Sequence, residues 1–560
     1  MTAAANPTGA VSGARMMADL REIARWVKLS GTDEEVEALR FIEQRLRDAG
    51  FRTETILHDA YISLPGPARV EVDNAALSAI THSFSRPSPA TGVTGEIVHV
   101  GNGTAADFAG KDLTGRIALI EGMATPANAR LASRAGAIGQ IHISHQEHRH
   151  EMCISPVWGS PSPTNLPELP TTVAVTLSQS DGAALRERVL RGERPRVVIH
   201  AAVDTAWRKT PLLVAELDAP GSGADAPFVL LSGHHDTWYF GVMDNGSANA
   251  GMLEVARVCA EHRAEWKRGL RLCFWSGHSH GRYSGSAWYA DTHWDELDRR
   301  CVAHVNVDSL GGIGASELAH AAAMTELGHL AREAVETVTG RPHRGGRKAR
   351  NSDESFGGIG VPSMFGIISE QAPGAVATRN NLGWWWHTPH DTLDKVDEAN
   401  LVRDTRVLAH AVWRLLTDVV VPLDHAATAE ALLAELAALR DRLGERFDLS
   451  VLIAAAERVR DASRAAQART PSDTLRADRA LMRASRALVP VDYTEGDRFA
   501  HPPALPLPAW PVLEPIRALA ATEAGSDAAR FATVEAIRAR NRLGLALRCA
   551  AAALDEACAT

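Results

Sequence analysis

The sequence predicts an α/β protein with a mostly parallel central sheet, an inserted β-rich domain and a helical C-terminal domain. Short apolar runs alternate with helical segments over residues 201–422, β-rich runs separated by turns fill residues 75–200, and the chain after residue 422 is rich in Ala, Leu and Arg. Alternating strands and helices are typical of a parallel sheet covered by helices. We therefore predict a main domain from residues 1–74 and 201–422, an insert at 75–200 and a helical domain at 423–560.

The first segments of the main domain are predicted to be helical. A cap-like stretch at residues 31–35 separates two of them, and Gly50 ends the second. The apolar residues at helical spacing are Leu20, Ile23, Ala24 and Val27 in the first segment, and Val36, Leu39, Ile42 and Leu46 in the second.

Short apolar runs predict the strands of the next two regions. In the insert they are residues 96–100, 116–121, 138–143 and 172–177, with a Pro- and Gly-rich loop at 155–170. In the main domain they are residues 228–231, 270–274 and 302–307, with a helix at 247–261. Ligands of such sheets collect at the carboxyl ends of the strands.

The C-terminal region is predicted to be a set of helices. Leu432, Leu436, Leu439 and Leu443 form one apolar stripe, and further helical runs follow at 449–467, 473–488 and 526–552. These stripes fit either core packing within the domain or the seam of a homodimer.

Charge, apolar patterning and cysteine spacing argue against nucleic-acid partners, membrane partners and a thiolate metal site. The formal charge is −9 and no run of five Lys or Arg occurs, so nucleic acid is not expected as a partner. The N-terminus lacks the apolar core of a signal peptide and no apolar run is long enough to span a bilayer, so we expect a cytoplasmic protein without a membrane partner. The six cysteines form no C-x-x-C pair, which argues against a thiolate zinc site.

Four metal-binding side chains follow predicted strands or begin a helix. His234 comes directly after the strand 228–231, Asp244 lies ten residues later, Asp308 follows the strand 302–307, and His387 comes later still. Imidazole and carboxylate ligands together suit Zn²⁺, and a shared carboxylate can bridge two ions about 3.5–4 Å apart. We expect Asp236 to hold the other ring nitrogen of His234.

The runs G-H-H-D-T-W, M-D-N-G-S, N-V-D-S and H-T-P-H-D-T that contain these residues resemble the zinc aminopeptidase family that includes glutamate carboxypeptidase II and the transferrin receptor. The resemblance implies a three-layer α/β sandwich, a protease-associated domain at residues 75–200 and a helical domain at the C-terminus. It implies His234, Asp244 and Asp308 around one zinc ion. It also implies Asp244, as the bridge, and His387 around a second.

The chain departs from this family at residues 275–286. Relatives have two adjacent Glu there, a general base and a ligand of the second zinc, whereas this chain has His278, Ser279 and His280. Alignment from Trp275 places His278 and Ser279 at the two positions, and alignment from Gly285 places Ser279 and His280 there. We expect His278 to act as the base or to contact substrate, and His280 to complete or approach the metal site, with a second metal that is weak or absent. The alternative is a non-catalytic, receptor-like binding protein.

A serine hydrolase is a further alternative. The run G-H-S-H-G at 277–281 matches the G-x-S-x-G nucleophile elbow, and Ser279, Asp308 and His387 follow the chain order of α/β-hydrolase triads. The pattern has only three defined positions in a chain with 44 glycines, and it leaves His234 and Asp244 without a role.

The expected reaction is hydrolysis of a peptide or small amide by one or two zinc ions. The residues expected to contact substrate are Arg282, Tyr283, Arg379, Asn380, the neighbouring Asn381, and Trp386 through its single N–H. The tract containing His142, His145, His148 and His150 fits either a solvated loop or a part of the insert that closes over substrate.

Overall fold

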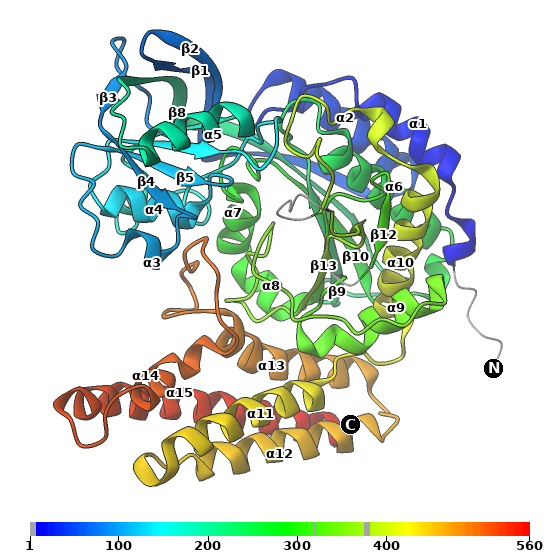
Figure 1. Ribbon diagram of the computed structural model, residues 1–560. Coiled ribbons are helices and arrows are strands. Elements are labelled where there is room, and N and C mark those ends of the chain that lie inside the picture. The colour runs from blue at the N-terminus through cyan, green and yellow to red at the C-terminus, as the bar shows by residue number, and fades with distance from the viewer. Residues whose placement is uncertain (1–6, 319–320, 375–380, 560) are drawn as a thin grey trace.

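The computed structural model describes residues 7–318, 321–374 and 381–559, and it has the predicted α/β architecture (Figure 1). One long sheet has the strand order β13-β11-β9-β10-β8-β1-β2-β7-β6-β5-β4, with β3 beside β8. Its strands are β1 (Arg52–Val72), β2 (Ala75–Thr81), β3 (Val93–Gly95), β4 (Ile97–Gly101), β5 (Ile117–Glu121), β6 (Gly139–Ile143), β7 (Val173–Leu177), β8 (Val197–Leu217), β9 (Phe228–His234), β10 (Gly269–Trp275), β11 (Cys301–Val307) and β13 (Ser363–Gly366). A separate pair is formed by β12 (Ala315–Glu317) and β14 (Glu370–Gln371).

The main domain has three layers. Its strands β13, β11, β9 and β10 are parallel. Alternate side chains of these strands face opposite layers, because successive residues of a strand point to opposite sides. One face packs on α1 (Gly13–Ile23), α6 (Ala248–Ala260), α9 (Gly328–Thr339) and α10 (Glu398–Thr417), and the other on α7 (Ser284–Thr292) and α8 (Trp294–Arg300).

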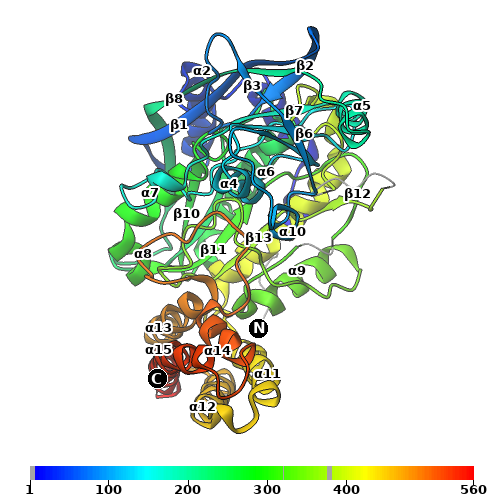
Figure 2. The same cartoon turned by 60° about the vertical axis from the view of Figure 1, so that its left-hand side comes forward.

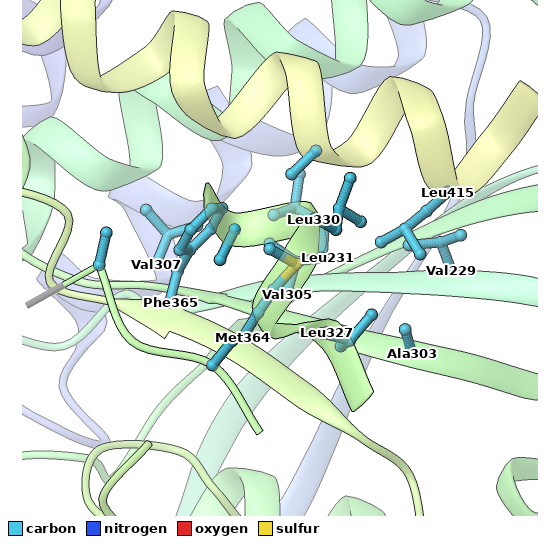
Figure 3. Close-up of a cluster of buried hydrophobic side chains, with 14 of the residues drawn as sticks. Val229, Leu231, Ala303, Val305, Val307, Leu327, Leu330, Met364, Phe365 and Leu415 are labelled. Carbon is cyan, nitrogen blue, oxygen red and sulfur yellow. The ribbon is translucent and has the colours of Figure 1, made fainter. Parts of the chain in front are cut away.

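Figure 3 shows the core on the first of these faces, where side chains of β9, β11 and β13 pack beneath α10. Val229, Leu231 and Val305 are among them, and each is fully buried. Burying such side chains contributes about 1.5–3 kcal/mol each. This packing holds the strand ends that carry the candidate ligands.

Two strands of 21 residues each connect the main domain to the insert. β1 and β8 pair antiparallel from Arg52 opposite Glu216 to Val72 opposite Val197, with one irregularity near Pro65. The sequence analysis predicted neither strand. The predicted boundary at residues 200–201 falls inside β8, so the two domains share one continuous sheet.

The predicted elements of the insert and the C-terminal region are confirmed within a few residues. The insert has its own apolar core between β5, β6, β7 and α5 (Gln179–Leu190). The C-terminal region packs α11 (His425–Leu443), α12 (Ser450–Gln467), α13 (Thr474–Tyr493) and α15 (Asp527–Cys558) together through buried leucines, and it lies below the other two domains in Figures 1 and 2. Among the described residues, no helix has the length and apolar character required to cross a membrane.

Candidate metal centre

Four side chains predicted as ligands meet at the carboxyl ends of the parallel strands. His234 ends β9, Asp308 follows β11 by one residue, Asp244 lies in the helical turn η3 (Val242–Ser247), and His387 lies in the loop before η6 (Leu393–Lys395). The Nε2 atom of His234 is 3.0 Å from Oδ1 of Asp244 and 3.5 Å from Oδ1 of Asp308. The Nε2 atom of His387 is 3.0 Å from the other oxygen, Oδ2, of Asp244. One carboxylate therefore lies between the two imidazoles.

The hydrogen bonds of the two histidines point their lone pairs at these carboxylates. Nδ1 of His234 lies 2.7 Å from the carbonyl oxygen of Asp236, and Nδ1 of His387 lies 2.6 Å from the carbonyl oxygen of Glu151. A carbonyl oxygen only accepts, so each Nδ1 carries a hydrogen and each neutral ring has its lone pair on Nε2. Nε2 of His234 and Oδ1 of Asp244 are both buried and have no hydrogen-bond partner among the residues that the structure describes. Two hydrogen-bond acceptors, Nε2 of His234 and Oδ1 of Asp244, therefore face each other. A cation between them would bind both.

Without a metal, the neighbouring carboxylates favour the protonated form of His234 through its raised pKa. Burial lowers the pKa of His234, but the carboxylates of Asp308 and Asp244 outweigh burial and raise this pKa well above its ordinary value. Burial raises the pKa of Asp244, but its contacts with His234 and His387 outweigh burial and lower that pKa well below its usual range. A divalent ion would displace the proton, and this set of imidazole and carboxylate donors fits zinc.

Asp391 supports the bridging carboxylate, and the sequence analysis did not assign it. Its two oxygens accept hydrogen bonds from the backbone N–H groups of Met243 and Asp244, at 2.8 and 3.0 Å. The only sequence signal was its place in the run H-T-P-H-D-T. The run therefore carries both a candidate ligand, His387, and a residue that holds the turn containing Asp244.

The role expected for Asp236 needs correction. Its backbone carbonyl, not its carboxylate, holds Nδ1 of His234. The fully buried carboxylate accepts hydrogen bonds from the backbone N–H groups of His278 and Ser279 at 3.1 and 2.9 Å, and from Oγ of Ser30 at 2.6 Å. Asp236 therefore shapes the loop that carries His278.

His278 lies beside the ligand group but is not aimed at the same point as His234. One donor atom from each of His234, His278 and Asp308 lies within 4.8 Å of the other two. The two imidazole rings, however, stack with centroids 3.7 Å apart and planes within 12°. A metal ion binds imidazole along the lone pair in the ring plane, and rings in parallel stacked planes cannot both direct lone pairs at one ion. His278 is therefore placed as a neighbour of the His234 metal position.

A fully buried carboxylate, Asp353, lies on the other side of His278. Its Oδ2 atom is 2.9 Å from Nδ1 of His278. A carboxylate accepts, so Nδ1 carries a hydrogen and Nε2 retains its lone pair. The preceding residue, Ser352, donates a hydrogen bond from Oγ to Oδ2 of Asp308 at 3.0 Å. The sequence analysis assigned no role to Asp353 or Ser352, because contacts over 75 and 44 residues leave no local pattern.

The structure does not place His280 in the ligand group. Its Nδ1 lies 3.0 Å from Oγ of Ser30, and its ring packs against Trp238 with centroids 4.4 Å apart. His280 thus belongs to the buried network behind the loop, next to Asp236.

The serine-hydrolase triad is not assembled. Oγ of Ser279 is buried without a hydrogen-bond partner among the described residues. His387 contacts Asp244 and Glu151, while Asp308 contacts His234, Ser309 and Ser352. No hydrogen bond joins Ser279 to either residue, so the geometry gives the elbow pattern no support.

A cavity of about 350 Å³ opens onto the cluster. Asp244, Asp308, His278 and His387 line it, and so do four of the residues expected to contact substrate: Arg282, Tyr283, Asn381 and Trp386. Arg379 and Asn380, which were also expected there, lie outside the described residues.

The His-rich tract of the insert is not simply a solvated loop. His142 and His150 are buried. His148 stacks on Trp384 with centroids 4.3 Å apart. The tract thus contacts the segment that carries His387.

Two family profiles match the chain: peptidase family M28 over residues 213–412 and the PA domain over residues 93–185. The chain is similar to the probable glutamate carboxypeptidase VP8 of Zea mays, with 23% identity over 497 residues that cover 74% of this chain and 68% of that protein. It is also similar to aminopeptidase YwaD of Bacillus subtilis, with 23% identity over 347 residues that cover 59% of this chain and 69% of that protein. Its fold resembles the aminopeptidase from Aneurinibacillus sp. strain AM-1, with a TM-score of 0.57, 24% identity, and coverage of 74% of this chain and 96% of that one. The part of the chain that carries the candidate ligands is therefore similar to peptidase family M28, and the insert is similar to the PA domain.

Proposed function

We propose that this protein is a zinc-dependent hydrolase of peptides or small amides. The observation that carries the proposal is the Asp244 carboxylate, whose two oxygens each face the bare Nε2 atom of a different histidine at 3.0 Å. The names of the relatives, a glutamate carboxypeptidase and an aminopeptidase, support a peptide-like substrate.

The chain offers two unequal metal positions that share Asp244. His234 and Asp308 complete the first, which has three protein ligands. The second has His387 and Asp244 alone, because Ser279 stands where relatives carry a carboxylate and serine is a poor zinc ligand beside imidazole and carboxylate. We therefore assign one tightly held ion and one weakly held ion. A bound zinc ion would polarise the scissile carbonyl and lower the pKa of a water molecule toward about 7.

His278 is assigned as the general base. Asp353 accepts the hydrogen of its Nδ1, which leaves Nε2 free to take a proton from the attacking water and then to give it to the leaving amine. His278, Arg282, Tyr283 and Trp386 line the cavity in which the substrate would lie. The Trp386 indole has one N–H to offer a substrate oxygen.

The test combines metal content with turnover. Zinc-loaded protein should hydrolyse members of a panel of aminoacyl-p-nitroanilides and N-acylated dipeptides. A chelator should abolish this activity, and added zinc should restore it. Metal content below about a tenth of an ion per chain after zinc is supplied would refute the metal site.

Two further outcomes would replace the proposed mechanism with another. Tight zinc binding without turnover of any panel member would favour the receptor-like alternative. Activity that survives the chelator, with labelling of Ser279 by a fluorophosphonate, would favour a serine mechanism.

A further inference from the structure

His387 has a backbone conformation that needs support from its surroundings. Its φ is +58°, in the left-handed region that side chains other than glycine rarely adopt. It lies outside every helix and strand of the described chain. A residue in such a conformation is strained and persists only where neighbouring contacts impose it. The contacts of His387 therefore decide whether its Nε2 atom faces Asp244.

The insert supplies two of those contacts through one residue. The backbone N–H of Glu151 donates to the carbonyl oxygen of His387 at 3.1 Å, and the carbonyl oxygen of Glu151 accepts from Nδ1 of His387 at 2.6 Å. The first bond holds the backbone of His387, and the second sets the tautomer and direction of its ring. Partners of this kind on ligating histidines affect metal affinity strongly.

The side chain of His150 holds the neighbouring peptide group. Its Nδ1 lies 2.5 Å from the carbonyl oxygen of Trp386, and its Nε2 lies 2.9 Å from Nε2 of Gln146. A carbonyl only accepts and the Gln146 amide nitrogen only donates, so the tautomer with hydrogen on Nδ1 satisfies both contacts. His150 is 5% exposed, so water cannot readily replace its bond to Trp386.

The supporting segment is anchored in the insert itself. The carbonyl oxygen of His148 accepts a hydrogen bond from Oγ of Ser144 at 2.6 Å, and the backbone N–H of Met152 donates to Nδ1 of His82 at 3.3 Å. His82 in turn contacts Thr176 of β7 at 2.8 Å. Residues 148–152 thus connect the sheet of the insert to the loop that carries His387.

We propose that the insert is a structural part of the second metal position, and that His150 is the positioning residue that holds the Trp386–His387 peptide for it. This inference rests on the proposed function, because it assumes that His387 binds zinc. It predicts that His150 affects the weaker zinc-binding step and leaves the tighter step, at His234, unchanged.

The experiment is a zinc titration of the full-length, metal-free protein in competition with a chelating dye that resolves the two steps. For His150→Ala, the weaker step should lose about 10-fold in affinity, at the lower end of the range for partners of metal ligands. His150→Asn, which keeps a side-chain N–H donor, should recover part of that loss. His145→Ala is the matched control, because His145 lies in the same tract and its side chain is exposed. It should leave both steps unchanged.

A second measurement tests the link between the weaker zinc position and the insert in wild-type protein, without a substitution. Hydrogen exchange of peptides covering residues 146–153 should slow in wild-type protein when the weaker step is saturated with zinc. The inference would be overturned if His150→Ala kept the affinity of the weaker zinc step within about twofold of wild type and the wild-type segment showed no zinc-dependent protection from exchange. The proposed function would still stand in that case. Wild-type protein that binds a single zinc ion, with no weaker step, would also overturn the inference alone, and protein that binds no zinc at all would overturn both.

Discussion

At the scale of single residues, the main feature is a histidine, His278, paired with a buried carboxylate, Asp353, beside the candidate metal ligands. Imidazole has an ordinary pKa near 6.5, so it can accept a proton near neutral pH. Asp353 determines which nitrogen of His278 does so, since it accepts the hydrogen of Nδ1 at 2.9 Å. In the proposed mechanism, this pairing would serve in proton transfer and not as a ligand of the tight zinc ion.

We predict that His278→Ala lowers the turnover number by about 10²–10⁴-fold, the usual contribution of a general base. The tight zinc ion should remain, because the stacked geometry excludes His278 as its ligand. Steady-state kinetics and elemental analysis of the same samples measure the two effects. Ser279→Ala is the control and should keep a measurable fraction of activity. Loss of the tight ion in His278→Ala would show that the histidine is a ligand after all.

Asp353→Asn should lower the turnover number by roughly 10–100-fold with little change in KM. The reason is that an amide can also donate to Nδ1 of His278, which would leave the hydrogen on Nε2, where the proposed base needs its lone pair. The double variant His278→Ala/Asp353→Asn should be no slower than His278→Ala alone, since Asp353 acts through His278. Additive losses in this cycle would mean that Asp353 has an independent role.

The two candidate ligand histidines should have separable effects on metal binding. His234→Ala should remove the tighter ion, because it deletes one of three protein ligands at that position. His387→Ala should remove only the weaker ion. Equilibrium dialysis against graded zinc concentrations measures both. Equal loss of both ions in each variant would indicate a single shared site.

At the scale of secondary-structure elements, strand ends and tight turns position the residues of the candidate site. The helices packed on the sheet hold the strands in place. The ligands follow β9 and β11, whose side chains are buried on both faces. At residues 352–353, Ser352 contacts the candidate ligand Asp308, and the next residue contacts the proposed base His278. A displaced turn would therefore alter the metal position and the base together.

The long helix α15 offers a matched test of core packing. Leu547 is fully buried, whereas Leu545 on the same helix is 56% exposed. Leu547→Ala should lower the free energy of unfolding by about 2–5 kcal/mol, because it removes buried methyl groups and leaves a cavity. Leu545→Ala should change it by less than about 0.5 kcal/mol. Urea unfolding followed by circular dichroism measures the difference, and equal effects would show that the outer face of α15 is covered in solution.

At the scale of the whole molecule, continuous structure joins the three domains. The strands β1 and β8 run from the main domain into the insert, and residues 148–152 return to the metal centre from the insert. At the other end, the backbone N–H of Asp424 donates to the carbonyl oxygen of Glu326, where the main domain meets the helical region. The insert and the helical region are thus both linked to the main domain by backbone contacts.

Stability should depend on pH through Glu326. Burial raises the pKa of this carboxyl from 4.5 to about 7, and Asp492 adds to the rise, while Thr428 and Arg347 oppose it. Between these two values the unfolded chain releases the proton and the folded protein keeps it, so the stability falls as pH rises through this window. Glu326→Gln removes this loss.

The Glu326→Gln variant should therefore gain stability relative to wild type between pH 5 and pH 8, by up to about 3 kcal/mol. Urea unfolding at both pH values measures the gain. The exposed Glu445 is the control, and Glu445→Gln should show no such difference. A gain that is the same at pH 5 and pH 8 would show that the carboxyl does not titrate in this range.

The sequence by itself determined the α/β class, the order of the domains and the four candidate ligands. Local periodicity identifies helices and short buried strands, and His234, Asp308 and the C-terminal leucine stripes lie in or directly after such segments. The carboxyl ends of parallel strands meet at one edge of the sheet, so the convergence of these residues followed from their order along the chain.

Only the tertiary structure decided how the site is completed. The strands β1 and β8 have mixed exposure and pair with each other across more than a hundred residues of sequence, so no simple alternation marks them. The contact of His278 with Asp353 spans 75 residues and that of His150 with Trp386 spans 236. A side chain's partner over such separations is set by the packing of whole elements, which local patterns do not record. For the same reason, the sequence could not show that Asp236 acts on His234 through its carbonyl, or that the insert holds His387.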